Sequence, residues 1–100
     1  MQKDIIRELA DRYGIQEIVG MDLAEAAERF ANVYDEGRTL TPWEVLGVTA
    51  AATPAEIEAA YRNKMALAAL WVNSSDPQRA ASAEEQIRDY TAALMIIQAD

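Results

Sequence analysis

Two copies of one helix-start signal lie twelve residues apart near the middle of the chain. Each copy is a Thr-Pro-x-Glu tetrapeptide, one beginning at Thr41 and the other at Thr53. Threonine caps the unpaired backbone N–H groups of a new helix, proline suits the first helical position, and the glutamate completes a capping box. Gly47 lies between the copies and suits the left-handed conformation that ends many helices. The pattern predicts a short helix of about one to two turns, followed closely by a second helix.

Two further helices are predicted in the first forty residues, where apolar side chains recur at helical spacing. The first runs from residue 2 to about residue 13. The second runs from about residue 23 to residue 34, with Asp22 as its N-cap and Gly37 just beyond its end. Residues 15–20 between them fit either another helical turn or an ordered connection, and in both cases they are expected to join the core.

The second Thr-Pro-x-Glu copy begins a long helix, predicted over residues 54–72. A clear break follows at residues 73–77. The final helix then starts either at Pro77, capped by Asp76, or one turn later, capped by Ser82. Its apolar stripe, the most regular in the chain, consists of Ala83, Ile87, Tyr90, Leu94 and Ile97. Since no segment alternates like a strand, the sequence predicts an all-α fold of five helices.

The composition restricts the chemistry that this chain can perform. It has no cysteine and no histidine, which excludes disulfides and thiolate catalysis and removes both the commonest metal ligand and the usual general base. Its four glycines are dispersed, so no glycine-rich phosphate loop is present. We therefore expect a protein that is not an enzyme and that holds no metal and no cofactor.

The chain is acidic, with a formal net charge of −8, and its nine basic residues form no cluster. Binding to a phosphate backbone needs clustered lysine and arginine, so direct nucleic-acid binding is disfavoured. The longest apolar run, residues 65–72, is too short to span a membrane, and the polar N-terminus does not fit a signal peptide. We expect a cytoplasmic protein.

The apolar run of residues 65–72 occupies every side of the predicted long helix. Such a run is either buried on both sides within the monomer or exposed as a patch that meets a protein partner. Trp71, at the end of this helix, is accordingly either a core residue or an interface anchor. The candidate protein-binding residues are Met65, Leu67, Leu70, Trp71 and Val72, together with the basic Arg62 and Lys64.

Residues 42–48, which read Pro-Trp-Glu-Val-Leu-Gly-Val, and residues 52–57, which read Ala-Thr-Pro-Ala-Glu-Ile, resemble the start of a J domain, the DnaJ co-chaperone module. Residues 85–94 are similar to the third helix of that family. The resemblance covers about residues 41–97 and implies an antiparallel helix pair preceded by a short helix. It also places Trp43 where the family has a core tyrosine.

Residues 1–40 have no counterpart in a minimal J domain. We expect them to form an N-terminal helical extension that packs on a J-like core, residues 41–100, so that the chain is a single domain. The extension either covers the surface through which a J domain meets its chaperone or is itself the recognition element.

The chain departs from the family at its active feature. J domains carry a His-Pro-Asp tripeptide after the second helix, and this tripeptide stimulates ATP hydrolysis by a DnaK-type partner; the corresponding residues here are Ala69-Leu70-Trp71. The basic face of the family's second helix is also missing, because two glutamates and two basic residues cancel over residues 55–72. The resemblance therefore implies a degenerate J-like domain that does not stimulate such an ATPase.

The J-like subunit of the mitochondrial import motor is similar in lacking the tripeptide, and it acts by pairing with an active J protein. By this precedent we expect a non-catalytic adaptor or regulator that binds a protein, either an active J protein or a second copy of itself. The alternative function rests on the net charge of −8 alone. It is an acidic regulator that binds the basic surface of a nucleic-acid-binding protein.

Overall fold

A computed structural model shows an all-α protein and describes residues 2–15, 18–34 and 41–98, without the side chains of residues 2–4 and 30–34. These residues contain no strand, so the predicted fold class is confirmed. Their helices are α1 (Gln2–Tyr13), α2 (Leu23–Tyr34), α3 (Pro42–Leu46), α4 (Pro54–Val72) and α5 (Pro77–Ile97).

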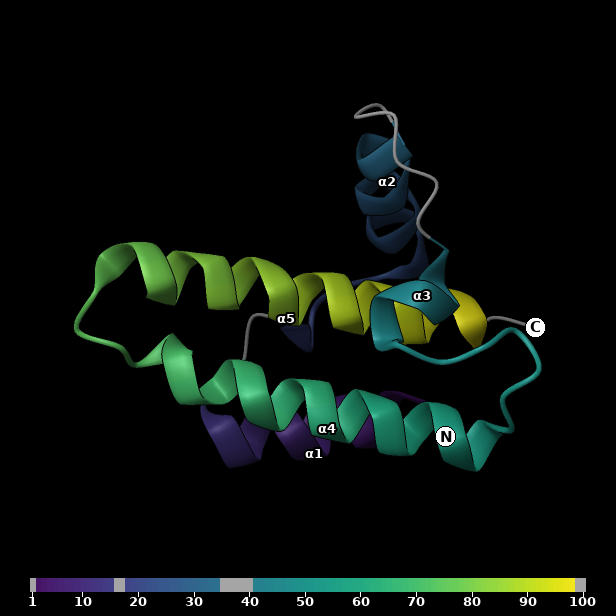
Figure 1. Ribbon diagram of the computed structural model, residues 1–100, viewed down its shortest axis with the longest axis horizontal. Coiled ribbons are helices and arrows are strands. Elements are labelled where there is room, and N and C mark those ends of the chain that lie inside the picture. The colour runs from purple at the N-terminus through teal and green to yellow at the C-terminus, as the bar shows by residue number, and fades with distance from the viewer. Residues whose placement is uncertain (1, 16–17, 35–40, 99–100) are drawn as a thin grey trace.

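The two longest helices, α4 and α5, form an antiparallel hairpin that organises the rest of the chain (Figure 1). We call the end where α4 begins and α5 finishes the base of the hairpin, and the end joined by residues 73–76 its tip. In the view of Figure 1, α3 lies in front of the base and α1 lies behind α4. Both α1 and α3 contact both helices of the hairpin, whereas α2 contacts only α5 among the described elements.

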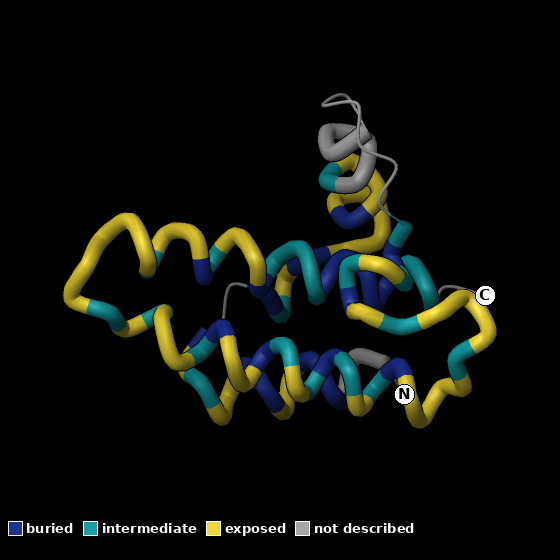
Figure 2. The backbone as a smooth tube through the Cα atoms, viewed as in Figure 1, coloured by how far each residue is buried: buried dark blue, intermediate teal, exposed yellow. Residues whose placement is uncertain are grey.

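The core is deepest towards the base (Figure 2). Ile57, Tyr61 and Met65 lie on one face of α4 and are buried. The final helix differs from its predicted single stripe, because residues 91–95 are buried on every side. The physical reason is that all four other helices contact α5. Small residues such as Ala92 and Ala93, which add little apolar area, let these helices approach closely.

Two consecutive hydrogen bonds link α4 to α5 inside this core. The Thr91 hydroxyl donates to the Ile87 carbonyl at 2.8 Å, so the Tyr61 hydroxyl, at 2.9 Å, donates to Thr91 Oγ1. Burial raises the pKa of Tyr61 to about 12. These contacts pair the hydroxyls at a position where an unpaired polar group costs free energy.

Both Thr-Pro-x-Glu copies form the predicted capping boxes. Thr41 Oγ1 accepts from the Glu44 N–H and Thr53 Oγ1 accepts from the Glu56 N–H, each at 3.2 Å, and each glutamate accepts from its threonine N–H in return. The backbone hydrogen bond from Thr53 lowers the pKa of Glu56. Gly47 ends α3 with a φ of 78°, in the left-handed region. The predicted short helix and its stop signal are therefore confirmed.

The start of α5 settles the alternative that the sequence left open. Asp76 Oδ1 accepts from the Gln78 N–H at 3.0 Å, and Pro77 is the first helical residue. The helix therefore begins at the earlier of the two predicted positions, and Ser82 lies within it.

The structure describes residues 15 and 18–20 of the segment between α1 and α2, where residue 18 is in a 3₁₀-helical turn and residues 19 and 20 form a turn. Ile15 and Ile18 are buried there, as expected. Trp43 is only half-buried, which differs from the core position implied by the resemblance, because α3 is a helix of five residues lying on the outside of the hairpin. Gly37, the residue predicted to lie just beyond the second helix, is outside the described residues.

Buried and charged side chains of the two N-terminal helices contact the hairpin. Three apolar residues of α1, Ile5, Ile6 and Leu9, are buried in the core. Among the side chains of α2 that the structure describes, Ala26 is buried, and Arg29 forms ion pairs with Glu85 at 3.0 Å and Asp89 at 2.9 Å on α5. The hydrogen bond from Arg29 lowers the pKa of Glu85.

Candidate protein-binding surface

The tip of the hairpin carries large apolar side chains in contact with solvent. Leu67 is 60% exposed, Leu70 is 71% exposed and Trp71 is 46% exposed. They lie at helical spacings of three and four residues, so they are neighbours on one face of α4. Exposed residues gather at this end of the hairpin in Figure 2. We call these three residues the tip patch.

Residues 65–72 were predicted to be either buried within the monomer or exposed as a patch, and the structure shows some of them buried and others exposed. Met65 is fully buried on the same face as Tyr61 and Ala68, so it is a core residue and is not part of a binding surface, contrary to its place among the candidates. Val72 is half-buried and packs against the core. The run is apolar all round because one face enters the core while the opposite face carries the tip patch.

The two basic candidates lie on different sides of α4. Arg62 donates to both carboxylate oxygens of Glu8 on α1, at 2.6 and 3.2 Å, and these contacts lower the pKa of Glu8. Lys64 lies beside Gly47, the residue that ends α3, where an added Cβ would be 3.5 Å from Lys64 Cε. Arg62 is therefore paired with a carboxylate of α1, and Lys64 lies beside the residue that ends α3.

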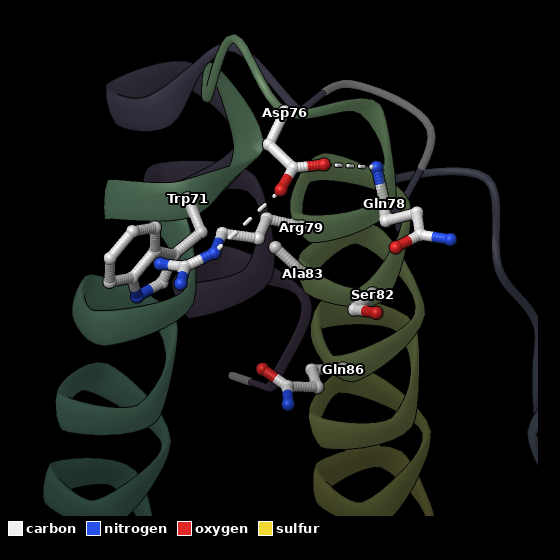
Figure 3. A pocket seen from close by; sticks show the side chains of 7 residues that line it. All are labelled: Trp71, Asp76, Gln78, Arg79, Ser82, Ala83 and Gln86. Atoms are coloured by element: carbon white, nitrogen blue, oxygen red, sulfur yellow. Dashed lines mark hydrogen bonds and ion pairs between the residues drawn. The ribbon is translucent and has the colours of Figure 1, made fainter.

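A groove beside the tip patch was not predicted from the sequence. It is an open hollow of about 460 Å³ between the end of α4 and the start of α5. We call it the tip groove, and Figure 3 shows the side chains that line it. They are Trp71, Asp76, Gln78, Arg79, Ser82, Ala83 and Gln86.

Arg79 and Trp71 form one wall of the tip groove. The guanidinium carbon of Arg79 lies 4.7 Å from the centre of the Trp71 ring, within the range of a cation–π interaction. Arg79 Nε also lies 3.9 Å from Asp76 Oδ2, while the other oxygen of Asp76 caps α5 (Figure 3). The sequence signal for the Asp76–Arg79 pair is its spacing of three residues. The stack on Trp71 has no such signal, because it crosses the turn between the helices.

The other hollow and the strongly shifted titratable group of the described structure lie away from the tip groove. A second hollow beside Ile6 and Met95 has a volume of about 20 Å³, room for about one water molecule. No group of three or more carboxylates among the described residues is placed to hold a metal ion. Tyr61, whose pKa is strongly shifted, lies in the core and does not line the tip groove.

No described helix combines the length and the apolar character needed to cross a bilayer. The chain was compared with protein-family models, with curated proteins and with solved structures, and none of them matches it.

Proposed function

We propose that this chain is a non-catalytic protein–protein interaction module, a J-like adaptor or regulator that does not stimulate a DnaK-type ATPase. The observation that carries the proposal is the tip patch. A single exposed leucine is ordinary on a protein surface, whereas three adjacent large apolar side chains are typical of an interaction site. Tryptophan is also among the residues that contribute most to binding energy at protein interfaces.

The J-like part of the proposal rests on the sequence resemblance and on two features of the hairpin. A short helix, α3, precedes an antiparallel pair and contacts both of its helices. Residues 69–71, which correspond to the His-Pro-Asp tripeptide, lie inside α4, which continues to Val72. A trigger that belongs in a loop is thus replaced by helical apolar residues, which supports an adaptor without ATPase stimulation.

The position of α1 helps to decide whether the N-terminal extension, residues 1–40, covers a surface of the hairpin or is itself the recognition element. α1 packs on α4, and its Glu8 pairs with Arg62, one of the few cations on that helix. We propose that the extension covers this side of α4 and leaves the tip patch as the binding surface. The partner is then either an active J protein or a second copy of the chain.

The first experiment measures ATP hydrolysis by a DnaK-type chaperone in the presence of the purified protein. We expect no stimulation, because neither the tripeptide nor a basic helix face is present. An active J protein serves as the positive control. Stimulation by this chain comparable with that control would contradict the proposal.

The second experiment tests the surface with two matched variants. Leu70→Glu places a charge in the tip patch, and Leu23→Glu does the same at a 47% exposed leucine on α2. Light scattering reports self-association, and titration calorimetry reports binding to an active J protein. We expect Leu70→Glu to weaken binding by about tenfold or more and Leu23→Glu to leave it unchanged.

Salt dependence distinguishes this proposal from the acidic-regulator alternative. Binding through apolar side chains should change little as salt is added, whereas binding of a −8 chain to a basic surface should weaken steeply. A wild-type protein that stays monomeric and binds no active J protein would count against the tip patch.

A further inference from the structure

The tip groove differs from the tip patch in presenting a cation beside an aromatic ring. We infer that it recognises a partner segment in which a carboxylate lies next to a large apolar side chain. The carboxylate pairs with Arg79, and the apolar side chain enters the groove against Trp71. This inference deepens the proposed function and rests on it, since it specifies the chemistry of the segment that binds at the tip.

Arg79 is held in position by two contacts that leave most of its donors unused. The guanidinium carbon lies over the Trp71 ring, and the contact of Asp76 is with Nε. The two terminal nitrogens have no hydrogen bond or ion pair to the described residues. An arginine oriented in this way loses less conformational entropy on binding, and its parallel N–H groups match the two oxygens of a carboxylate.

The charged residues that line the groove are one cation, Arg79, and one carboxylate, Asp76, although the whole chain is acidic. Asp76 is the one carboxylate among the groove's lining residues, and one of its oxygens already caps α5. Two acidic residues further along α5, Glu85 and Asp89, bind Arg29 of α2 and do not line the groove. Asp76 is therefore the one negative charge in the lining beside Arg79, while Glu85 and Asp89 are offset by Arg29.

The volume and the lining of the groove explain why the ligand needs an apolar side chain next to its carboxylate. Its volume of about 460 Å³ falls in the range of small-ligand and side-chain pockets. Ala83, the small residue between the two helices, is buried, while Ser82 and Gln86 offer polar groups on the α5 side (Figure 3). A free inorganic anion would use Arg79 but leave the Trp71 side of the groove unfilled. A peptide with both groups contacts both Arg79 and Trp71.

The test selects ligands from a library of random peptides displayed on phage, with the full-length protein as bait. We expect the enriched peptides to carry Asp or Glu within two residues of a large aliphatic or aromatic residue. A synthetic copy of the strongest peptide is then titrated against the wild type and variants. Arg79→Gln should weaken its binding by about tenfold or more, since a charge-assisted bidentate pair is lost.

Two matched variants make the result specific. Arg79→Lys keeps the positive charge but loses the paired N–H donors of the guanidinium. It should therefore bind the peptide more tightly than Arg79→Gln and less tightly than the wild type. Arg12→Gln removes the same charge from an exposed position on α1 and should have no effect. Circular dichroism confirms that each variant is folded, which we expect because both arginines are exposed.

Three outcomes would overturn the inference: no enriched peptide, enriched peptides without acidic residues, or equal binding to wild type and Arg79→Gln. The proposed function fails separately. If Leu70→Glu abolishes binding to a protein partner while Arg79→Gln has no effect on the selected peptide, the tip patch stands and this inference is wrong. If the peptide depends on Arg79 but Leu70→Glu leaves partner binding intact, the groove stands and the tip patch does not.

Discussion

The base and the tip of the α4–α5 hairpin are made from the same two helices but differ in what packs against them. Near the base α3 lies against the hairpin, and residues 91–95 are buried on every side. At the tip Leu70 and Trp71 remain exposed. The comparison teaches that packing is concentrated at the base of the helix pair, which leaves the tip available for the binding that we propose. Five predictions test this difference, ordered by the size of the expected effect.

The largest effect is expected for truncation of a leucine near the base. Leu94 is fully buried, so Leu94→Ala should lower the free energy of unfolding by about 2–5 kcal/mol. The loss combines the apolar transfer free energy with the cavity that remains. Urea denaturation followed by circular dichroism measures it. A change below about 1 kcal/mol would mean that this part of α5 is less tightly packed than its burial indicates.

Alkaline pH should destabilise the base next most strongly. Burial raises the pKa of Tyr61 from 10.0 to about 12. The unfolded chain therefore releases this proton at a lower pH than the folded chain. Stability is unaffected below about pH 10 and falls by about 1.4 kcal/mol per pH unit as pH rises through the folded pKa, or about 2–3 kcal/mol in all.

Urea midpoints measured from about pH 9 to about pH 12 follow this titration. Tyr61→Phe is the control, and it should flatten the alkaline loss. If the wild type and the Tyr61→Phe variant lose stability equally over this range, the phenol of Tyr61 is not the group responsible.

The hydroxyl pair inside the base provides the third test. Thr91→Val leaves the buried Tyr61 hydroxyl without its acceptor and should cost about 1–3 kcal/mol. The double variant Tyr61→Phe/Thr91→Val removes both hydroxyls and should cost less than the sum of the single changes. A double-mutant cycle from denaturation data gives the coupling. Additive losses would show that the two hydroxyls contribute independently.

A smaller effect is expected at the end of α3. Gly47 has a φ of +78°, and an added Cβ there would make only ordinary contact with Lys64. The cost of Gly47→Ala therefore comes from the left-handed backbone and should be about 1–2 kcal/mol. Gly20→Ala is the matched control, because an added Cβ meets no atom within 4 Å there and φ lies outside the left-handed region. Equal losses at the two positions would refute this backbone explanation.

The smallest effect on stability is expected at the tip. Leu70→Ala should change the free energy of unfolding by no more than about 0.5 kcal/mol, because the side chain is already in contact with water. It is the counterpart of Leu94→Ala, with the same atoms removed from the other end of the hairpin. A loss of more than about 1 kcal/mol would mean that the tip patch contributes to folding and that packing is not concentrated at the base.

The sequence predicted the secondary structure closely because its signals are local. Thr41 and Thr53 each contact a glutamate three residues away, and Gly47 ends a helix through its own backbone conformation. Such interactions form between neighbours in the chain, whatever surrounds them. The candidate surface was predicted in part. Leu67, Leu70 and Trp71 are exposed, whereas Met65 was wrongly grouped with them, because an apolar run does not by itself reveal which of its faces meets the core.

By itself, then, the sequence determined the all-α class, the helices and their caps. The tertiary structure decided which face of residues 65–72 is open, why α5 is buried on all sides near its end, and how Arg79 comes to lie on Trp71. These features depend on contacts between helices that are distant in sequence, such as the crossing of α4 and α5 and the packing of α1 and α3 upon them. Capping energies act within one turn, whereas exposure is a property of the assembled surface.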